Sequence, residues 1–218
     1  MESAMLTIHH LGISQSDRVV WLMEELGLPY ELKWYHRGED FLAPAEYRAL
    51  HPVGTAPIIS DDNLVMAEST AIVEYISQQY GGGALSVLPG DPDYAQYLFW
   101  MHFNNNLQSV LFMKLAFQAG GAQAGDDNPM TTTTQRREDG IYNALEQRLK
   151  ESDYLGGNRF TCADIMSMFN LTSLSMLGAR QIDDTLPNTL AYVQRVTARP
   201  AYQKAMSIAG PEATPPAA

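Results

Sequence analysis

The spacing of apolar and polar residues changes twice within the first thirty-five positions of the chain. Residues 5–9 form a short apolar-rich run, and the turn-prone stretch at residues 12–17 separates this run from a helical stripe. Four apolar residues share one face of the predicted helix: Val19, Leu22, Met23 and Leu26. Gly27 is typical of a helix end, and residues 30–34 alternate at period two, as a strand does. A strand, a helix and a second strand in this order predict a parallel pair with a right-handed crossover.

The next segment predicts a short helix and then a hairpin. The helix is expected at residues 41–50, and the turn Asp61-Asp62-Asn63 lies between two short apolar runs, residues 57–60 and 64–67. A further helix with apolar residues at 72, 73 and 76 follows and ends at a run of three glycines. The pattern is βαβ followed by ββα, which predicts an α/β domain with a small mixed sheet covered by helices.

After residue 80 the chain is expected to be helical throughout. Three helical segments are predicted: residues 94–117, 141–149 and 165–177. Glycine and proline residues between the first domain and these helices indicate a linker. The expected division is an α/β domain at residues 1–82, a linker at 83–91 and an all-α helical bundle at 92–218 with a loose C-terminal tail.

Composition and charge narrow the classes of partner. The 218 residues are 45% hydrophobic and 18% charged, which is typical of a globular protein. A single cysteine, Cys162, allows no intrachain disulfide, and the opening residues 1–4 lack the basic start of a secretory signal, so we expect a cytoplasmic protein. A formal net charge of −11 argues against nucleic acids and anionic membranes as partners. A small anionic ligand stays compatible with one local cationic site.

Two short segments have residues suited to holding a peptide-like ligand. Thr55-Ala56-Pro57 leads into the third predicted strand, where the Ala56–Pro57 bond is either an ordinary trans bond or a cis bond that turns the Ala56 backbone outward. Glu68-Ser69 opens the following helix, whose N-terminus attracts a carboxylate. Together Ser69 and Glu68 would grip an α-amino acid head group, although simple helix capping explains both residues as well.

Ser14 is the candidate for thiol chemistry. It lies in the loop before the helix that contains Arg18, so its hydroxyl can donate a hydrogen bond to a ligand sulfur. That bond and the helix dipole both favour the thiolate, which is the nucleophilic form. Ser16 is its neighbour, and is better placed to cap the helix.

Four motifs together resemble the glutathione S-transferase family. They are Ser14 four residues before Arg18, the VGTAP sequence at residues 53–57, the AESTAI sequence at residues 67–72, and the YLGGNRFTCAD sequence at residues 154–164. The resemblance covers nearly the whole chain except the tail.

The resemblance implies a thioredoxin-like, glutathione-binding first domain joined to a helical second domain, in a homodimer. It also implies that Pro57 follows a cis bond and that Ala56, Glu68 and Ser69 hold glutathione. In this family the residue at the position of Ser14 activates the sulfur of glutathione.

One departure from the family pattern concerns Thr55. Many members have Lys or Arg at this position, so the partner of one glutathione carboxylate is open. Thr55 would bind glutathione through a neutral hydrogen bond, and His36, Arg37 or His51 are candidates to supply charge.

The expected activity is transfer of glutathione to a small electrophilic substrate, with no metal. A glutathione-dependent isomerase, ether-cleaving enzyme or peroxidase would use the same thiolate, and a non-catalytic protein-interaction module is the alternative from another class. The absence of a cysteine near Ser14 argues against the glutaredoxin-like and dehydroascorbate-reducing branches. The asparagine run at residues 104–106 is a candidate contact for the electrophile. Thr161 and Asp164 are expected to form a capping box, and Cys162 to fill a buried space.

Overall fold

The structure, a computed structural model, describes residues 5–121 and 128–215, and these form two compact units. One unit takes its described residues from Met1–Leu88 and Val196–Ala218, and the other takes them from Pro89–Arg195. The expected division assigned all of residues 92–218 to the helical domain, whereas here the last helix lies in the first unit. The expected chain start at residues 1–4 and the last three residues of the expected tail lie outside the described residues.

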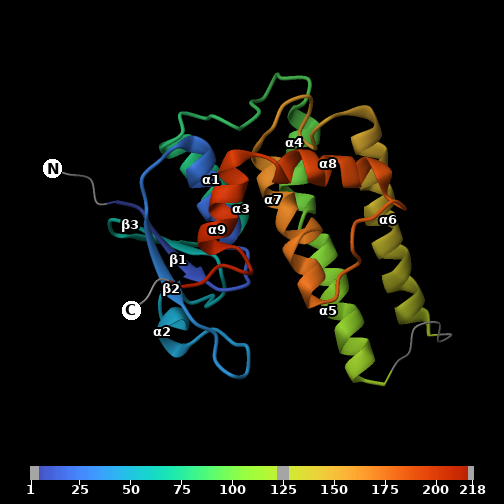
Figure 1. Ribbon diagram of the computed structural model, residues 1–218, viewed down its shortest axis with the longest axis horizontal. Coiled ribbons are helices and arrows are strands. Elements are labelled where there is room, and N and C mark those ends of the chain that lie inside the picture. Colours follow the sequence, from blue (N-terminus) through green and yellow to red (C-terminus); the bar gives the residue numbers. More distant parts are fainter. Residues whose placement is uncertain (1–4, 122–127, 216–218) are drawn as a thin grey trace. The chain divides into compact units, whose positions relative to one another are not determined.

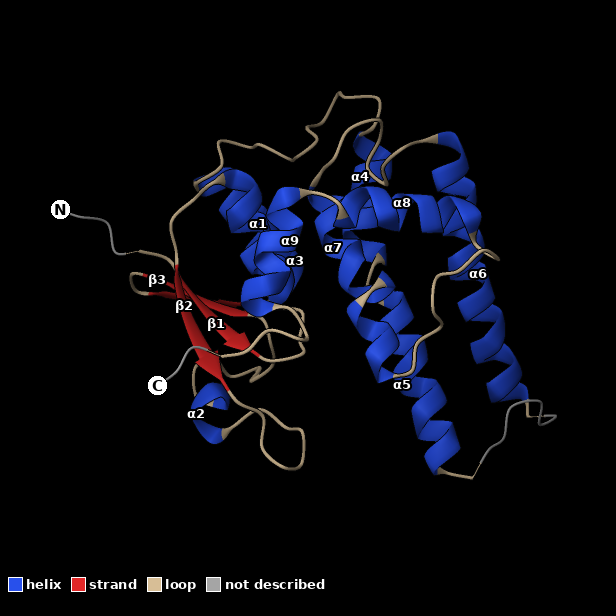
Figure 2. Cartoon of the chain, in the orientation of Figure 1, coloured by secondary structure: helices blue, strands red, loops and turns tan. Residues whose placement is uncertain are grey.

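A four-stranded mixed sheet forms the centre of the first unit (Figure 2). Its strands are β1 (Thr7–Leu11), β2 (Glu31–Tyr35), β3 (Ile58–Asp61) and β4 (Leu64–Ala67), in the spatial order β2-β1-β3-β4. β1 pairs with β2 in parallel, whereas β1–β3 and β3–β4 pair antiparallel. The predicted βαβ–ββα pattern is therefore confirmed.

Most helices of this unit begin or end at a local sequence signal. They are α1 (Asp17–Leu26), α2 (Ala45–Arg48), α3 (Ser69–Gln79) and α9 (Pro200–Ala209). α1 ends at Gly27, whose φ of 63° suits a residue without a Cβ. α2 is shorter than expected, and its Tyr47 packs with Leu11, Tyr35 and Ile58 of the sheet in one apolar cluster.

The last helix, α9, packs against α1 (Figure 1). The Trp21 ring meets Tyr202 edge to face with ring centroids 4.9 Å apart. Two nitrogens of Arg199 donate to the two oxygens of Glu25, each at 2.7 Å. Aromatic burial and a paired guanidinium–carboxylate contact therefore fix the C-terminal segment to the first unit.

The second unit is helical, as the sequence predicts. Its helices are α4 (Tyr94–Phe103), α5 (Asn106–Ala119), α6 (Pro129–Glu151), α7 (Cys162–Leu171) and the 3₁₀ helix η1 (Ser173–Leu177), and α8 (Pro187–Thr197) begins here. The expected single helix at residues 94–117 is wrong at one point, because the chain breaks between α4 and α5. There the Asn104 side chain donates to the Met101 carbonyl at 2.5 Å, and Asn170 of α7 donates to the Asn104 carbonyl. Asn104 is buried, so its side chain serves this break rather than an exposed contact.

The capping box at the start of α7 is confirmed. Thr161 and Asp164 exchange the two bonds of the box, and the Thr161 backbone N–H donates to the carboxylate of Asp164 at 2.8 Å. The same carboxylate accepts from the Leu155 N–H and from the Tyr192 hydroxyl, both at 2.9 Å. Cys162 is buried beside the box, as expected. Asp164 therefore ties the start of α7 to α8 and to the preceding loop.

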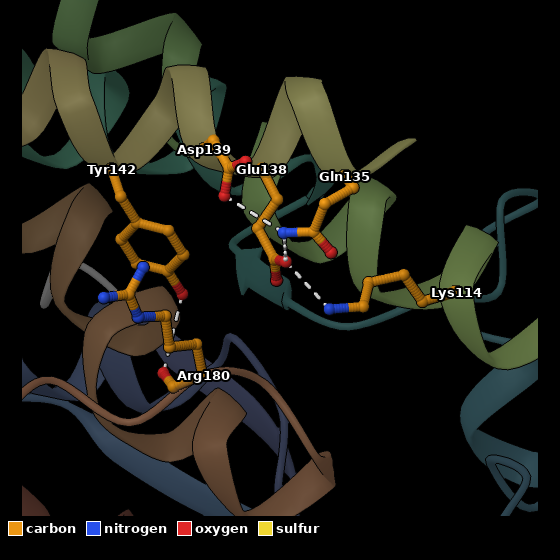
Figure 3. A network of polar contacts seen from close by, with 6 residues as sticks. All are labelled: Lys114, Gln135, Glu138, Asp139, Tyr142 and Arg180. Carbon is orange, nitrogen blue, oxygen red and sulfur yellow. Dashed lines mark hydrogen bonds and ion pairs between the residues drawn. The ribbon is translucent and has the colours of Figure 1, made fainter. Parts of the chain in front are cut away.

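A polar network joins α5, α6 and the segment before α8 (Figure 3). The Lys114 ammonium lies 2.8 Å from the largely buried Glu138 carboxylate, which also accepts from Gln135 at 3.2 Å. Tyr142 lies one turn after Glu138 on α6, and the Arg180 guanidinium lies over its ring, 5.1 Å from the centroid. Burial and then the nearby Glu138 raise the pKa of Tyr142 to about 12, so this phenol stays protonated.

Candidate active site

The first unit contains a cavity of about 300 Å³ at the ends of β3 and β4 and the start of α3. Its walls come from three stretches of chain: the loop after β1, the segment before β3, and the junction of β4 with α3. The lining residues are Gln15, His51, Val53, Thr55, Ala56, Pro57, Ala67, Glu68 and Ser69. Five of the six residues expected to bind glutathione therefore line one cavity.

The segment before β3 lines the cavity with Thr55, Ala56 and Pro57. The Ala56–Pro57 bond is cis, in agreement with the resemblance and against the base rate for proline bonds. Thr55 is exposed, Ala56 is half-buried and Pro57 is buried, so the chain passes from the cavity rim into the sheet.

The junction of β4 with α3 adopts an unusual backbone. Glu68 has a φ of 77°, which few residues other than glycine adopt, and it is the N-cap of α3. Its carboxylate accepts from the Thr70 N–H at 3.3 Å. The capping explanation for Glu68 is thus confirmed, and the carboxylate lies at the cavity as well. Such strained positions often occur where a ligand binds.

A buried cation lies behind the cavity floor. Arg18 of α1 is 1% exposed, and its guanidinium donates to the Ser69 hydroxyl at 3.2 Å. That hydroxyl in turn donates to the Gln15 amide oxygen at 3.3 Å. Burial lowers the pKa of Arg18 to about 10, while Asp17 and Glu68 oppose the shift, so the positive charge persists at neutral pH. This charge and the N-terminus of α3 make the floor favourable for an anion.

Ser14 lies beside the cavity but is not among the lining residues, and it is 8% exposed. The residue before it, Ile13, has a φ of 51°, a conformation rare for a β-branched side chain. Arg37 holds this loop, because its guanidinium donates to the Gly12 carbonyl at 2.8 Å and to the Ile13 carbonyl at 3.0 Å. A third bond from Arg37 reaches the Phe41 carbonyl at 2.8 Å. The loop that carries Ser14 is therefore fixed by a side chain from the segment just after β2.

The Ser14 hydroxyl takes part in a local set of hydrogen bonds. Its oxygen lies 2.5 Å from the Leu11 carbonyl, to which it donates, and 2.7 Å from the Ser16 hydroxyl. The Ser16 hydroxyl also lies 2.8 Å from Nδ1 of the buried His10. In the structure the Ser14 hydroxyl donates to the end of β1, and rotation about the Cβ–Oγ bond would redirect its proton.

The three residues expected to supply positive charge for a glutathione carboxylate lie in different places in the structure. His51 lines the cavity, where its Nδ1 accepts from the Val53 N–H at 3.2 Å. Arg37 holds the Ser14 loop, and His36 is exposed and not among the lining residues. Gln15 was missed by the sequence reasoning. Its position next to Ser14, before a helix start, was the available signal.

Within residues 5–121 and 128–215, no three His, Cys, Asp or Glu side chains gather in a way that could hold a metal ion. Among the helices that the structure describes, none has both the length and the apolar composition needed to cross a bilayer.

Comparisons with known proteins agree with the fold. Residues 14–79 match the model of the glutathione S-transferase N-terminal domain, and residues 110–200 match that of the C-terminal domain. Glutathione S-transferase 3 of Schizosaccharomyces pombe is 33% identical over 186 residues, which cover 76% of this chain and 72% of that protein. The chain therefore belongs to the glutathione S-transferase family, which is a family of enzymes.

Solved structures show the same architecture. A glutathione S-transferase from Actinobacillus pleuropneumoniae superposes with a TM-score of 0.83 at 30% identity, covering 95% of each chain. A theta-class glutathione S-transferase from Xanthomonas axonopodis pv. citri, solved with glutathione bound, gives a TM-score of 0.68 at 25% identity. That alignment covers 94% of this chain and 98% of that one.

Proposed function

We propose that the protein is a glutathione transferase that binds glutathione in the cavity of the first unit and directs its thiolate at a small electrophile. The observation that carries this proposal is the convergence of the segment before β3 with the start of α3 around one cavity of about 300 Å³. This arrangement suits a peptide, since it offers backbone groups at Ala56 and an anion-binding helix start at Ser69. Family membership supports the same ligand.

Each end of glutathione has a proposed partner. Its α-carboxylate would lie at the N-terminus of α3 and the Ser69 hydroxyl, with the charge of Arg18 behind them. Its α-ammonium would pair with the Glu68 carboxylate. The Ala56 backbone would pair with the peptide group, and Thr55 with His51 would meet the glycine carboxylate. Among these partners, Arg18 carries the positive charge that offsets the high overall negative charge locally.

Ser14 is proposed to stabilise the thiolate by donating its hydroxyl proton to the sulfur. The hydroxyl precedes α1, so the positive end of that helix acts in the same direction. In this mechanism Ser14 forms no covalent bond with the substrate. Catalysis comes from a larger thiolate fraction and from holding the thiolate next to the electrophile.

Calorimetry with glutathione, combined with ultraviolet absorbance of the bound thiolate against pH, tests the proposal. Ser14→Ala should leave the affinity for glutathione within about twofold while raising the pKa of the bound thiol by about one unit, equivalent to one charge-assisted hydrogen bond. Ser77→Ala, which removes another buried hydroxyl on α3, should change neither quantity. No binding at millimolar glutathione would refute the enzyme function and favour the protein-interaction module.

Assays with alkyl halides, epoxides, peroxides and aryl ethers would identify the electrophile class and separate transfer from isomerisation, ether cleavage and peroxide reduction. We also propose a cytoplasmic homodimer. Its support is the single cysteine and a group of exposed apolar side chains on the first unit: Phe41, Leu42 and Val53, at 73%, 58% and 62% exposure. Sedimentation analysis would give the oligomeric state directly.

A further inference from the structure

Three buried side chains form a hydrogen-bonded series that ends at the Ser14 hydroxyl. It begins at His10 on β1, whose side chain is fully buried and whose ring lies edge-on to Trp34 with centroids 4.2 Å apart. Nδ1 of His10 lies 2.8 Å from the Ser16 hydroxyl, and Ser16 lies 2.7 Å from the Ser14 hydroxyl. None of these contacts has a part in the proposed binding of glutathione, so the series needs its own explanation.

The proton of the His10 ring can be assigned from its surroundings. Burial, and then the positive charge of Arg37, lower the pKa of His10 to about 4, so the ring is neutral at pH 7 and carries one proton. Nε2 is buried and has no hydrogen-bond partner among the described residues, whereas Nδ1 faces the Ser16 hydroxyl. Unpaired buried donors are rarer in proteins than unpaired acceptors, so the proton belongs on Nδ1. His10 is then a donor to Ser16.

The hydrogen bonds around Ser16 direct its own proton to Ser14. Its hydroxyl oxygen has two acceptor positions, and these are filled by the His10 Nδ1–H and by the Leu11 backbone N–H at 3.3 Å. Its single proton must therefore be donated. The Ser14 oxygen at 2.7 Å is the near acceptor, because the Leu11 carbonyl lies at the longer distance of 3.5 Å.

The same count for Ser14 fixes its role. Its oxygen accepts from the Ser16 hydroxyl at 2.7 Å and from the Ser16 backbone N–H at 3.3 Å, which fills both acceptor positions. Its one proton is donated to the Leu11 carbonyl at 2.5 Å, and a ligand sulfur would take the place of that carbonyl as the acceptor. We propose that His10 is a positioning residue that acts through Ser16 to make the Ser14 hydroxyl exclusively a hydrogen-bond donor. This inference rests on the proposed role of Ser14 toward the glutathione sulfur.

The donor-to-acceptor direction of the hydrogen bonds from His10 through Ser16 to Ser14 decides whether the thiolate or the thiol of glutathione is favoured. A hydroxyl that can only donate stabilises a thiolate, since a thiolate accepts hydrogen bonds and a thiol S–H donates one. With the His10 proton on Nε2 instead, Ser16 would donate to Nδ1, and Ser14 would be able to donate to Ser16. Ser14 would then have an acceptor position open for the thiol S–H. His10 therefore determines the sign of the effect that Ser14 has on the thiol pKa.

The test measures the pKa of the bound glutathione thiol in variants of His10 and Ser16. His10→Leu should raise that pKa by about one unit and leave binding of the protonated thiol form within about twofold. His10→Asn should restore the wild-type value, because its amide N–H can occupy the place of the ring Nδ1–H. Ser16→Ala should match His10→Leu, and the double variant should shift the pKa no further than either single change.

His9→Leu is the matched control for loss of a buried histidine from the same strand. The His9 ring points to the other face of the sheet, where it bonds to Tyr35 at 3.1 Å and Ser60 at 2.7 Å. It should leave the thiol pKa unchanged. Equal shifts in His10→Leu and His9→Leu would show that His10 has only a structural role, and failure of His10→Asn to restore the value would also overturn the inference.

Nitrogen-15 NMR of the wild-type imidazole tests the tautomer without any variant that must fold. A proton on Nδ1 of His10 is the expected result, and a proton on Nε2 overturns the inference. The outcome is separable from the proposed function. If Ser14→Ala leaves the thiol pKa unchanged, the role of Ser14 fails, whereas a shift in Ser14→Ala without one in His10→Leu refutes the role of His10 alone.

Discussion

Acidification should destabilise the first unit through His10. The pKa of this ring is lowered from 6.5 to about 4 in the folded protein, first by burial and then by Arg37. Between these two values the unfolded chain binds a proton that the folded chain does not, so stability falls as the pH falls through this window. The stabilisation that comes from keeping His10 neutral in the folded protein is fully present above about pH 6.5 and fully lost below about pH 4. The shift corresponds to about 3 kcal/mol at the acid end.

Urea unfolding measured from about pH 7 to about pH 4 would show this loss, when wild type is compared with His10→Asn. The variant has no imidazole at this position, so subtracting its profile from the wild-type profile cancels the protonation of all other groups. An NMR titration of the His10 ring gives the folded-state pKa independently. A difference between the two profiles that does not change with pH, or a ring that titrates near its ordinary pKa, would refute this reasoning.

Two further predictions concern the contacts of single arginines. Arg199→Ala should lower the free energy of urea unfolding by about 2 kcal/mol, because it removes a bidentate bond to the buried Glu25 carboxylate. Arg195→Ala, which removes a more exposed ion pair and a bond to the Asp153 carbonyl, should cost about 1 kcal/mol or less, and equal costs in the two variants would contradict this prediction. Arg37→Met should speed amide hydrogen exchange in the Ser14 loop and reduce kcat/KM for glutathione about tenfold, since the loop carbonyls lose their donors. The control is Lys33→Met, because Lys33 is exposed. Unchanged amide hydrogen exchange in Arg37→Met would show that Arg37 does not hold the Ser14 loop.

The fold of the first unit could be predicted because its signals are local. Gly27 ends α1, and the Asp61-Asp62-Asn63 turn joins two strands with alternating side chains. The break between α4 and α5 escaped prediction because the apolar pattern continues through it. At the break the Asn104 carbonyl accepts from Asn170, which lies 66 positions away in sequence. Contacts over such distances leave no periodic signal.

The sequence predicted which segments lie at the candidate site better than it predicted the directions of their side-chain hydrogen bonds. The motifs around Thr55 and Ser69 placed two walls of the cavity correctly. The sequence offered Arg37 as a charge for the ligand, yet its guanidinium is used by loop carbonyls. The direction of the Ser14 hydroxyl depends on His10, four residues earlier on a strand, and only the folded loop brings the two side chains into one series. The direction of a hydroxyl hydrogen bond depends on which groups surround the hydroxyl in the folded protein.

The packing of α9 against α1 has a consequence for the order in which the chain is made. The first unit needs a helix that follows the whole of the second unit in sequence, whereas the second unit is contiguous between Pro89 and Arg195. On the ribosome, Trp21 stays without the Tyr202 ring, and Glu25 without Arg199, until the whole of the second unit has been synthesised. The helical unit is therefore free to fold during synthesis while the glutathione-binding unit waits for its last helix. A nascent chain stalled before residue 199 would carry an exposed apolar face on α1, and would be a natural client for chaperones.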